Sequence, residues 1–79
     1  MKKQIKTDIE LFAINKAREF RTKLGISQSD LAFRLDVSAG FIGKVESVNS
    51  PTKYNLNHIN KLAEIFSCSP KDFLPEKKL

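Results

Sequence analysis

Apolar residues recur every three or four positions along most of this chain, and residues that start or end helices interrupt this spacing at short intervals. The first segment has one apolar stripe, formed by Ile9, Phe12, Ala13, Ala17, Phe20 and Leu24. The stripe predicts a helix over residues 8–24, which Thr7 and Glu10 can begin as a capping box and Gly25 can end. No segment alternates in the way that predicts a strand. We therefore expect an all-helical fold.

Two short helices joined by a short turn are predicted in the middle of the chain. Ser27 is an N-cap candidate for a helix over residues 28–35, which Asp36 ends. Ser38 is an N-cap candidate for a helix over residues 39–47. The inward-facing apolar residues of this pair are Leu31, Ala32, Leu35, Ile42 and Val45. Helices that share a core in this way form a helix-turn-helix, although periodicity alone does not distinguish it from another small bundle.

Two more helices are predicted after a polar loop. The loop is the segment VNSPTKYN, residues 48–55, which contains Pro51. The amphipathic fourth helix that follows has as its apolar face Leu56, Ile59, Leu62, Ala63 and Phe66. Ser69 as cap and Pro70 as first helical residue predict a short fifth helix. Its apolar residues are Phe73 and Leu74.

The length of 79 residues predicts one domain, which we expect over residues 8–74, between a flexible basic tail at 1–7 and a C-terminal tail at 75–79. Cys68 is the only cysteine and His58 the only histidine, so a disulfide framework and a zinc finger are excluded, and no metal or other cofactor is expected. We expect His58 on a helix surface.

Several function classes lack the residue patterns that they need. No apolar run approaches the roughly 18 residues of a membrane span, and the N-terminus has no apolar leader segment, so we expect a cytoplasmic protein without membrane contact. The chain has neither a phosphate-binding glycine loop nor a plausible pair of nucleophile and base. We therefore expect no enzyme and no small-molecule ligand.

The net charge of +5 and a sequence pI near 9.6 are compatible with a polyanionic partner. The excess lies mainly in residues 1–24, which carry seven basic and three acidic side chains, whereas residues 25–54 carry three of each. Lys2, Lys3 and Lys6 are expected to be a solvated tail, with a basic arm that attracts phosphate as the alternative.

The segment GISQSDLAFRLDVSAGFIGKVE, residues 25–46, resembles the helix-turn-helix of the phage-repressor and Cro-like family. The resemblance covers about residues 14–74, because NLNHINKLAEIF and SPKDFL are similar to the family's fourth and fifth helices. It implies a compact five-helix fold of the lambda-repressor type that binds DNA. Where the family often has glycine in the turn, this chain has Asp36, which tolerates positive φ better than most residues.

The resemblance also implies residues that contact DNA phosphates. Gln28 matches the family's phosphate-binding glutamine at the first turn of the second helix, where backbone amides also favour anions; the alternative is a solvated surface side chain. The hydroxyls of Ser27 and Ser38 can add contacts while capping helices. The loop before the fourth helix offers further candidates, which are Asn49, Lys53 and Tyr54.

The family's partly buried ion pair matches Arg21 and Glu46, which would connect the first helix to the end of the third. Desolvation offsets the attraction in such a pair, but removal of one partner can cost about 3 to 5 kcal/mol because it leaves a buried charge alone. We expect this pair to orient the third helix. The alternative is two separate surface charges.

The third helix would present Ala39, Gly40, Gly43 and Lys44 to base edges in the major groove. Only Lys44 among them has a hydrogen-bonding side chain, and Phe41 is equally a candidate for contact with DNA or for the core. Two glycines inside a helix cost about 1 kcal/mol each relative to alanine. Close approach of the backbone to DNA explains them, and so does a relaxed surface that depends on DNA shape.

These observations predict a transcriptional regulator, a repressor, that binds double-stranded DNA as a homodimer with half-sites about 34 to 36 Å apart. The dimer surface is expected at the fifth helix and the end of the fourth. Its candidate residues, each equally a candidate for the core, are Phe66, Phe73 and Leu74. Because the third helix is poor in polar groups, the alternative is an antitoxin-like or adaptor module that binds protein on the same scaffold.

Overall fold

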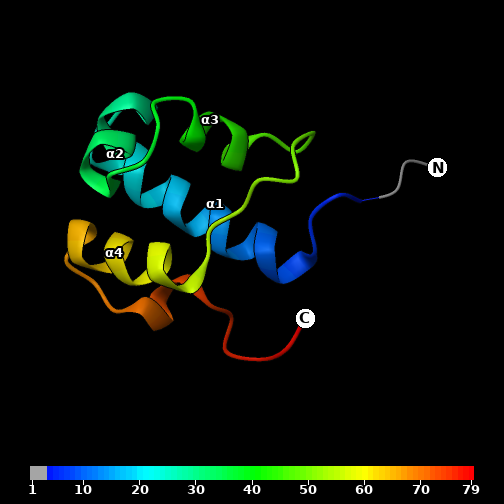
Figure 1. Cartoon of the computed structure of the whole chain (residues 1–79). Helices are drawn as coiled ribbons and strands as arrows, with labels where there is room; N and C mark the ends of the chain where they lie inside the picture. Colours follow the sequence, from blue (N-terminus) through cyan, green and yellow to red (C-terminus); the bar gives the residue numbers. More distant parts are fainter. Residues whose placement is uncertain (1–3) are drawn as a thin grey trace.

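Five helical segments make up the computed structural model, which describes residues 4–79 (Figure 1). They are α1 (Asp8–Lys23), α2 (Gln28–Leu35), α3 (Phe41–Glu46), α4 (Leu56–Phe66) and the 3-10 helix η1 (Pro70–Phe73). The long helix α1 packs against α3, α4 and η1, while α2 packs against both α3 and α4. The all-helical prediction is confirmed for the described residues, but the predicted fifth helix is a single four-residue 3-10 turn.

The ends of α1 follow from the residues that flank it. Thr7 and Glu10 form the predicted capping box: the Thr7 hydroxyl accepts from the Glu10 amide at 3.3 Å, and the Glu10 carboxylate accepts from the Thr7 amide at 2.9 Å. At the other end Gly25 has a φ of +68°, and the Ile26 amide donates to the Arg21 carbonyl at 3.0 Å. This is the Schellman motif, and it redirects the chain into α2.

The turn between α2 and α3 depends on a residue with positive φ that is not glycine. Ser27 caps α2 by accepting from the Asp30 amide at 3.0 Å, as predicted. Asp36 ends α2 with a φ of 61°, and the amide of Val37 then donates to the carbonyl of Ala32 at 3.0 Å. The expectation that Asp36 replaces a turn glycine is confirmed.

The third helix is shorter than predicted. It begins at Phe41 and not at residue 39, and Ser38 gives it no side-chain cap. Instead the Phe41 amide donates to the backbone carbonyl of Ser38 at 3.0 Å, which closes a turn over Ala39 and Gly40. Glycine lowers helix propensity by about 1 kcal/mol, so the glycine-containing start of this segment does not extend the helix.

The core lies where α1 meets the other helices. Its fully buried large side chains are Leu31, Ile42, Val45, Leu62 and Phe73. Three predicted core residues are wrong, since Ile9, Leu24 and Leu56 are exposed at 46%, 59% and 82%. Each lies at or beyond a helix end, where the helix extends past the core. Because other helices cover α1 from two sides, α1 also buries Ile14, which the single predicted stripe leaves out.

An aromatic cluster closes the core on the α4 side. Phe20 stacks on Phe66 with ring centroids 5.5 Å apart and lies at the same distance from Phe73. Phe66 and Phe73 are both buried, so they belong to the core, whereas Leu74 is 45% exposed. Of the predicted dimer residues, only Leu74 is therefore on the surface.

Residues 4–79 contain neither a membrane-spanning helix nor a cluster of metal-binding side chains. None of their helices has the length and apolar content that a bilayer crossing requires. No three of their His, Cys, Asp or Glu side chains are grouped so that they could hold a metal ion.

Candidate nucleic-acid interface

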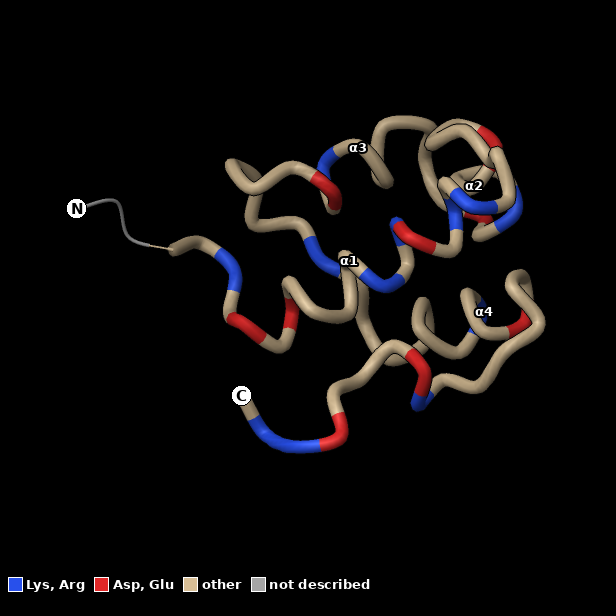
Figure 2. The backbone as a smooth tube through the Cα atoms, turned by 180° about the vertical axis from the view of Figure 1, so that it is seen from behind, with Lys and Arg blue, Asp and Glu red and all other residues tan. Residues whose placement is uncertain are grey.

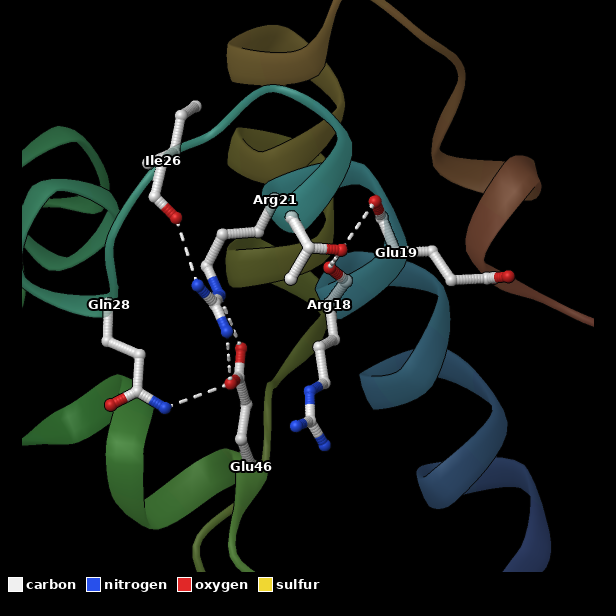
Figure 3. A network of polar contacts seen from close by, with 7 residues as sticks. Arg18, Glu19, Arg21, Ile26, Gln28 and Glu46 are labelled. Carbon is white, nitrogen blue, oxygen red and sulfur yellow. Dashed lines mark hydrogen bonds and ion pairs between the residues drawn. The ribbon is translucent and has the colours of Figure 1, made fainter.

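The amide of Gln28 lies at the first turn of α2 and reaches across to α3. Its Nε2 donates to Oε1 of Glu46 at 3.0 Å, while its Oε1 would lie 3.3 Å from a Cβ added at Gly43 (Figure 3). Since an amide nitrogen carries two hydrogens, one remains for another acceptor. Gln28 is exposed, as is its neighbour Ser27, whose hydroxyl accepts from the Asp30 amide and can still donate its own hydrogen.

Arg21 and Glu46 form a bidentate ion pair between the last turn of α1 and the last turn of α3. Arg21 Nε lies 2.9 Å from Glu46 Oε2, and its Nη2 lies 2.8 Å from Oε1. The remaining guanidinium nitrogen, Nη1, donates to the Ile26 carbonyl at 2.9 Å. The two side chains are only 11% and 4% exposed. With Gln28 they form one network that joins α1, the start of α2 and α3 (Figure 3).

The start of α3 exposes small residues and one cation. Ala39, Gly40 and Lys44 are exposed, whereas Gly43 is half-buried beside the Gln28 amide. Lys44 is thus the one exposed side chain of this set that can donate a hydrogen bond. Ser38 is exposed in the turn before the helix, close in sequence to these residues.

Phe41 packs toward the interior. Its ring centroid lies 5.0 Å from that of His58 and 6.3 Å from that of Tyr54, and it borders the buried core. Of the two interpretations of Phe41, the structure favours the core aromatic. The N-terminal end of α3 therefore rests on a group of aromatic rings, formed by Phe41, Tyr54 and His58.

His58 belongs to this group and also caps α4. Its Nδ1 accepts from the Asn55 amide at 3.0 Å, and the Asn55 side chain accepts from the His58 amide at 2.8 Å. Burial lowers the pKa of His58 because it disfavours the charged imidazolium. The expected surface histidine is thus half-buried and has a structural role.

The three phosphate candidates of the loop differ in what surrounds them. Asn49 is exposed. Lys53 Nζ lies 2.6 Å from the carboxylate of Glu10, which holds the pKa of that carboxyl below its usual range. The Tyr54 hydroxyl is buried without a hydrogen-bond partner, and burial raises its pKa. The structure therefore does not place the Tyr54 hydroxyl where it could reach a phosphate.

Lys6 does not lie in a solvated tail, so this prediction is wrong. The residue is 2% exposed, and its ammonium donates to the carbonyls of Val45 and Ser47, each at 2.6 Å, and of Lys44 at 3.4 Å. Nothing in the spacing of the lysines indicated this contact, because the acceptors are backbone atoms almost forty residues away. Lys2 and Lys3 lie outside the described residues.

Basic residues are not concentrated on the helix-turn-helix (Figure 2). On α2, Arg34 pairs with Asp30 at 3.1 Å, and the only charged residues of α3 are Lys44 and Glu46. Any attraction of this unit to a polyanion must therefore come from few side chains, from helix-end amides and from the rest of the chain.

Known proteins share this fold. A solved structure of a hypothetical transcription factor, NHTF, from Neisseria superposes with a TM-score of 0.74 at 24% identity, covering 86% of this chain and 76% of that one. The restriction-modification controller protein C.AhdI from Aeromonas hydrophila superposes with a TM-score of 0.69 at 31% identity, covering 85% and 97%. Among curated proteins none matches the sequence. The family model for the Cro/C1-type helix-turn-helix DNA-binding domain matches residues 18–75, and the chain belongs to this family.

Proposed function

We propose that this protein is a sequence-specific transcriptional regulator that binds double-stranded DNA by docking α3 in the major groove. The observation that carries the proposal is the exposed surface formed by the starts of α2 and α3 in a chain of the Cro/C1-type family. In a helix-turn-helix, the start of the second helix of the motif meets base edges. A protein bound at a promoter also excludes polymerase from overlapping DNA, so we propose a repressor.

Phosphate contacts hold the protein at the groove in this proposal. The spare amide hydrogen of Gln28, the hydroxyl of Ser27 and the backbone amides at the start of α2 point to one phosphate site. Ser38, Asn49 and Lys53 supply further contacts, and Lys53 would do so with the part of its side chain, 49%, that stays exposed beside Glu10. Glu46 orients the Gln28 amide in the free protein.

Direct base contacts are few in this proposal, because Lys44 is the exposed donor on α3 and can reach guanine O6 and N7. Ala39 can meet a thymine methyl group, while Gly40 and Gly43 let the backbone come close to DNA. Part of the specificity then comes from sequence-dependent DNA shape.

We propose that the protein acts as a homodimer whose half-sites lie about 34 to 36 Å apart. Ile9, Leu56 and Leu74 are exposed around an apolar groove of about 420 Å³ between the start of α1 and the start of α4. Burial of such side chains in a dimer is favourable by about 25 cal/mol per Å². Sedimentation should show a dimer that Leu56→Glu dissociates, whereas Leu24→Glu, at the far end of α1, leaves it intact.

The experiment that tests DNA binding measures the affinity for the duplex that the protein selects from a random library, over a range of salt concentrations. The logarithm of the affinity should fall linearly with the logarithm of salt, by about 0.9 per phosphate contact. Gln28→Ala should weaken binding to every duplex by a similar factor, whereas Asn60→Ala, an exposed amide on α4, should not. Absence of salt-sensitive binding to any duplex rejects the proposed function.

A further inference from the structure

The C-terminal end of α3 receives a cation from outside the helix-turn-helix. Lys6 precedes α1, and its ammonium donates to three carbonyls, those of Lys44, Val45 and Ser47. The carbonyls at the end of a helix carry partial negative charge. Those of Lys44 and Ser47 also accept from the amides of Ser47 and Ser50, at 3.2 and 3.3 Å. An ammonium has three hydrogens and no acceptor. The three donors of Lys6 are thus matched to three acceptors, and the residue itself is only 2% exposed.

The backbone that carries Lys6 is itself fixed. Thr7, the next residue, is the N-cap of α1 and is bonded to Glu10 in both directions of the capping box. The base of the Lys6 side chain is therefore part of a rigid helix start. A contact from a rigid base to backbone atoms can determine where the end of α3 lies.

Arg21 approaches the same turn of α3 from the opposite end of α1. A helix of 16 residues is about 24 Å long, so Lys6 and Arg21 contact α3 from two well-separated points. By contrast, the N-terminal end of α3 has no side-chain cap. The six-residue helix therefore has side-chain polar partners only in its last turn, which is also the turn that carries Lys44.

We propose that Lys6 is a positioning residue for DNA recognition: its contact with the carbonyls of α3 sets the angle at which Gly40 and Lys44 meet the major groove. This inference rests on the proposed function. Since the ammonium is buried on backbone acceptors, Lys6 itself does not bind phosphate. Burial lowers the pKa of the Lys6 amine, and the charge of Lys53 acts in the same direction, whereas the carboxylate of Glu10 raises it.

The test compares Lys6→Met, which keeps the length and the apolar stem, with Lys61→Met, which removes one exposed lysine from α4. Hydrogen exchange of the free proteins is measured at the amides of Lys44 and Ser47, which donate to the carbonyls of Gly40 and Lys44. In Lys6→Met we expect these two amides to exchange at least about tenfold faster, and in Lys61→Met at the unchanged rate. Unchanged exchange in Lys6→Met overturns the inference.

Binding is then measured on the selected duplex and on a scrambled duplex of the same composition. Lys6→Met should lower the ratio of the two affinities about tenfold and leave the salt slope as it is, because no phosphate contact is lost. A salt slope that falls by about one contact, with equal loss on both duplexes, would make Lys6 a phosphate ligand and overturn the inference.

Lys6→Arg keeps the experiment decisive if Lys6→Met does not fold. A planar guanidinium keeps the charge but cannot direct its donors to the same three carbonyls. We expect faster exchange at Ser47 and a lower affinity ratio, and wild-type values in both would overturn the inference. If the wild-type protein binds no duplex, the proposed function fails, whereas the exchange data still decide whether Lys6 fixes α3.

Discussion

The two ends of α3 are supported in different ways. At the C-terminal end, the ion pair of Arg21 with Glu46 and the ammonium of Lys6 provide buried polar contacts. At the N-terminal end, the support is the packing of Phe41 against the rings of Tyr54 and His58, and no side chain caps the helix.

This difference indicates how a very short helix can present a surface with few side chains. Polar contacts have a direction, so they fix the position of the end that stays inside the protein. The aromatic contacts support the other end from the inside and leave its outer side, at Ala39 and Gly40, without bulky groups. In the proposed docking, these small exposed residues let the helix come close to DNA.

Removal of the Arg21 cation, which pairs with Glu46 at the C-terminal end of α3, should have the largest effect. Arg21→Met leaves the carboxylate of Glu46, which is 4% exposed, without its main partner. We expect a loss of about 3 to 5 kcal/mol in the free energy of unfolding. For a domain of this size that is a decrease of more than about 10 °C in Tm, which thermal unfolding measures.

Two further variants separate this explanation from a general effect of charge. Arg34→Ala breaks the exposed pair with Asp30, whose side chains are 48% and 44% exposed, and should cost only about 0.3 to 0.5 kcal/mol. Combining Arg21→Met with Glu46→Leu should recover part of the loss, since no buried charge then remains unpaired. Equal effects of Arg21→Met and Arg34→Ala would contradict the anchoring role.

Glycine substitutions test the opposite end. Gly40 has a φ of −85°, and an added Cβ would meet nothing within 4 Å, so nothing in the chain itself requires glycine there. Gly40→Ala should raise the free energy of unfolding by about 0.4 to 1 kcal/mol through the unfolded state. If the backbone approaches DNA at this residue, the same variant should weaken DNA binding, as a titration with the selected duplex would measure.

Gly43→Ala is the matched control, because an added Cβ there would lie 3.3 Å from the Gln28 amide oxygen. Here the gain in helix propensity, about 1 kcal/mol, is opposed by the displacement of Gln28, so the net change in stability should be smaller than the propensity alone gives. Unchanged DNA binding by Gly40→Ala would contradict a close approach of the backbone to DNA at Gly40. It would favour a relaxed recognition surface that depends on DNA shape.

Much of the fold could be predicted because its signals are local. Thr7, Ser27 and Asp36 act within a few residues of their own positions, and they lie where the sequence predicted helix ends. The third helix was predicted to start at residue 39 for the same reason, since Ser38 is a typical cap residue, but Ser38 does not cap the helix and Gly40 precedes its first residue. Packing determines which residues are helical here, because Ile42 and Val45 are fully buried and hold α3 against the core.

The candidate site was less predictable, because its contacts join distant segments. The family resemblance paired Arg21 with Glu46, and the structure brings the two side chains together. No pattern indicated that Lys6 would reach the carbonyls of α3 or that the Tyr54 hydroxyl would be buried. Both depend on the path of the chain before α1 and after α3, which periodicity does not determine.

The smallest expected effect concerns the aromatic support at the N-terminal end of α3. Burial lowers the pKa of His58, so between that value and the ordinary value of about 6.5 the unfolded chain binds more protons than the folded one. The contribution of His58 to the free energy of unfolding is therefore fully present above about pH 6.5, and it is lost as the pH falls through the lower folded-state pKa. Protonation of Nδ1 also removes the acceptor for the Asn55 amide.

Thermal unfolding at about pH 7.5 and pH 5 should accordingly give a slightly lower Tm at the acidic pH. His58→Gln is the control, since glutamine can complete the capping box with Asn55 but does not titrate, and its Tm should change less between the two pH values. If the variant and the wild type respond equally, other groups cause the pH dependence. The N-terminal end of α3 would then be insensitive to the charge of His58. Only its C-terminal end, at Arg21 and Glu46, would depend on charge.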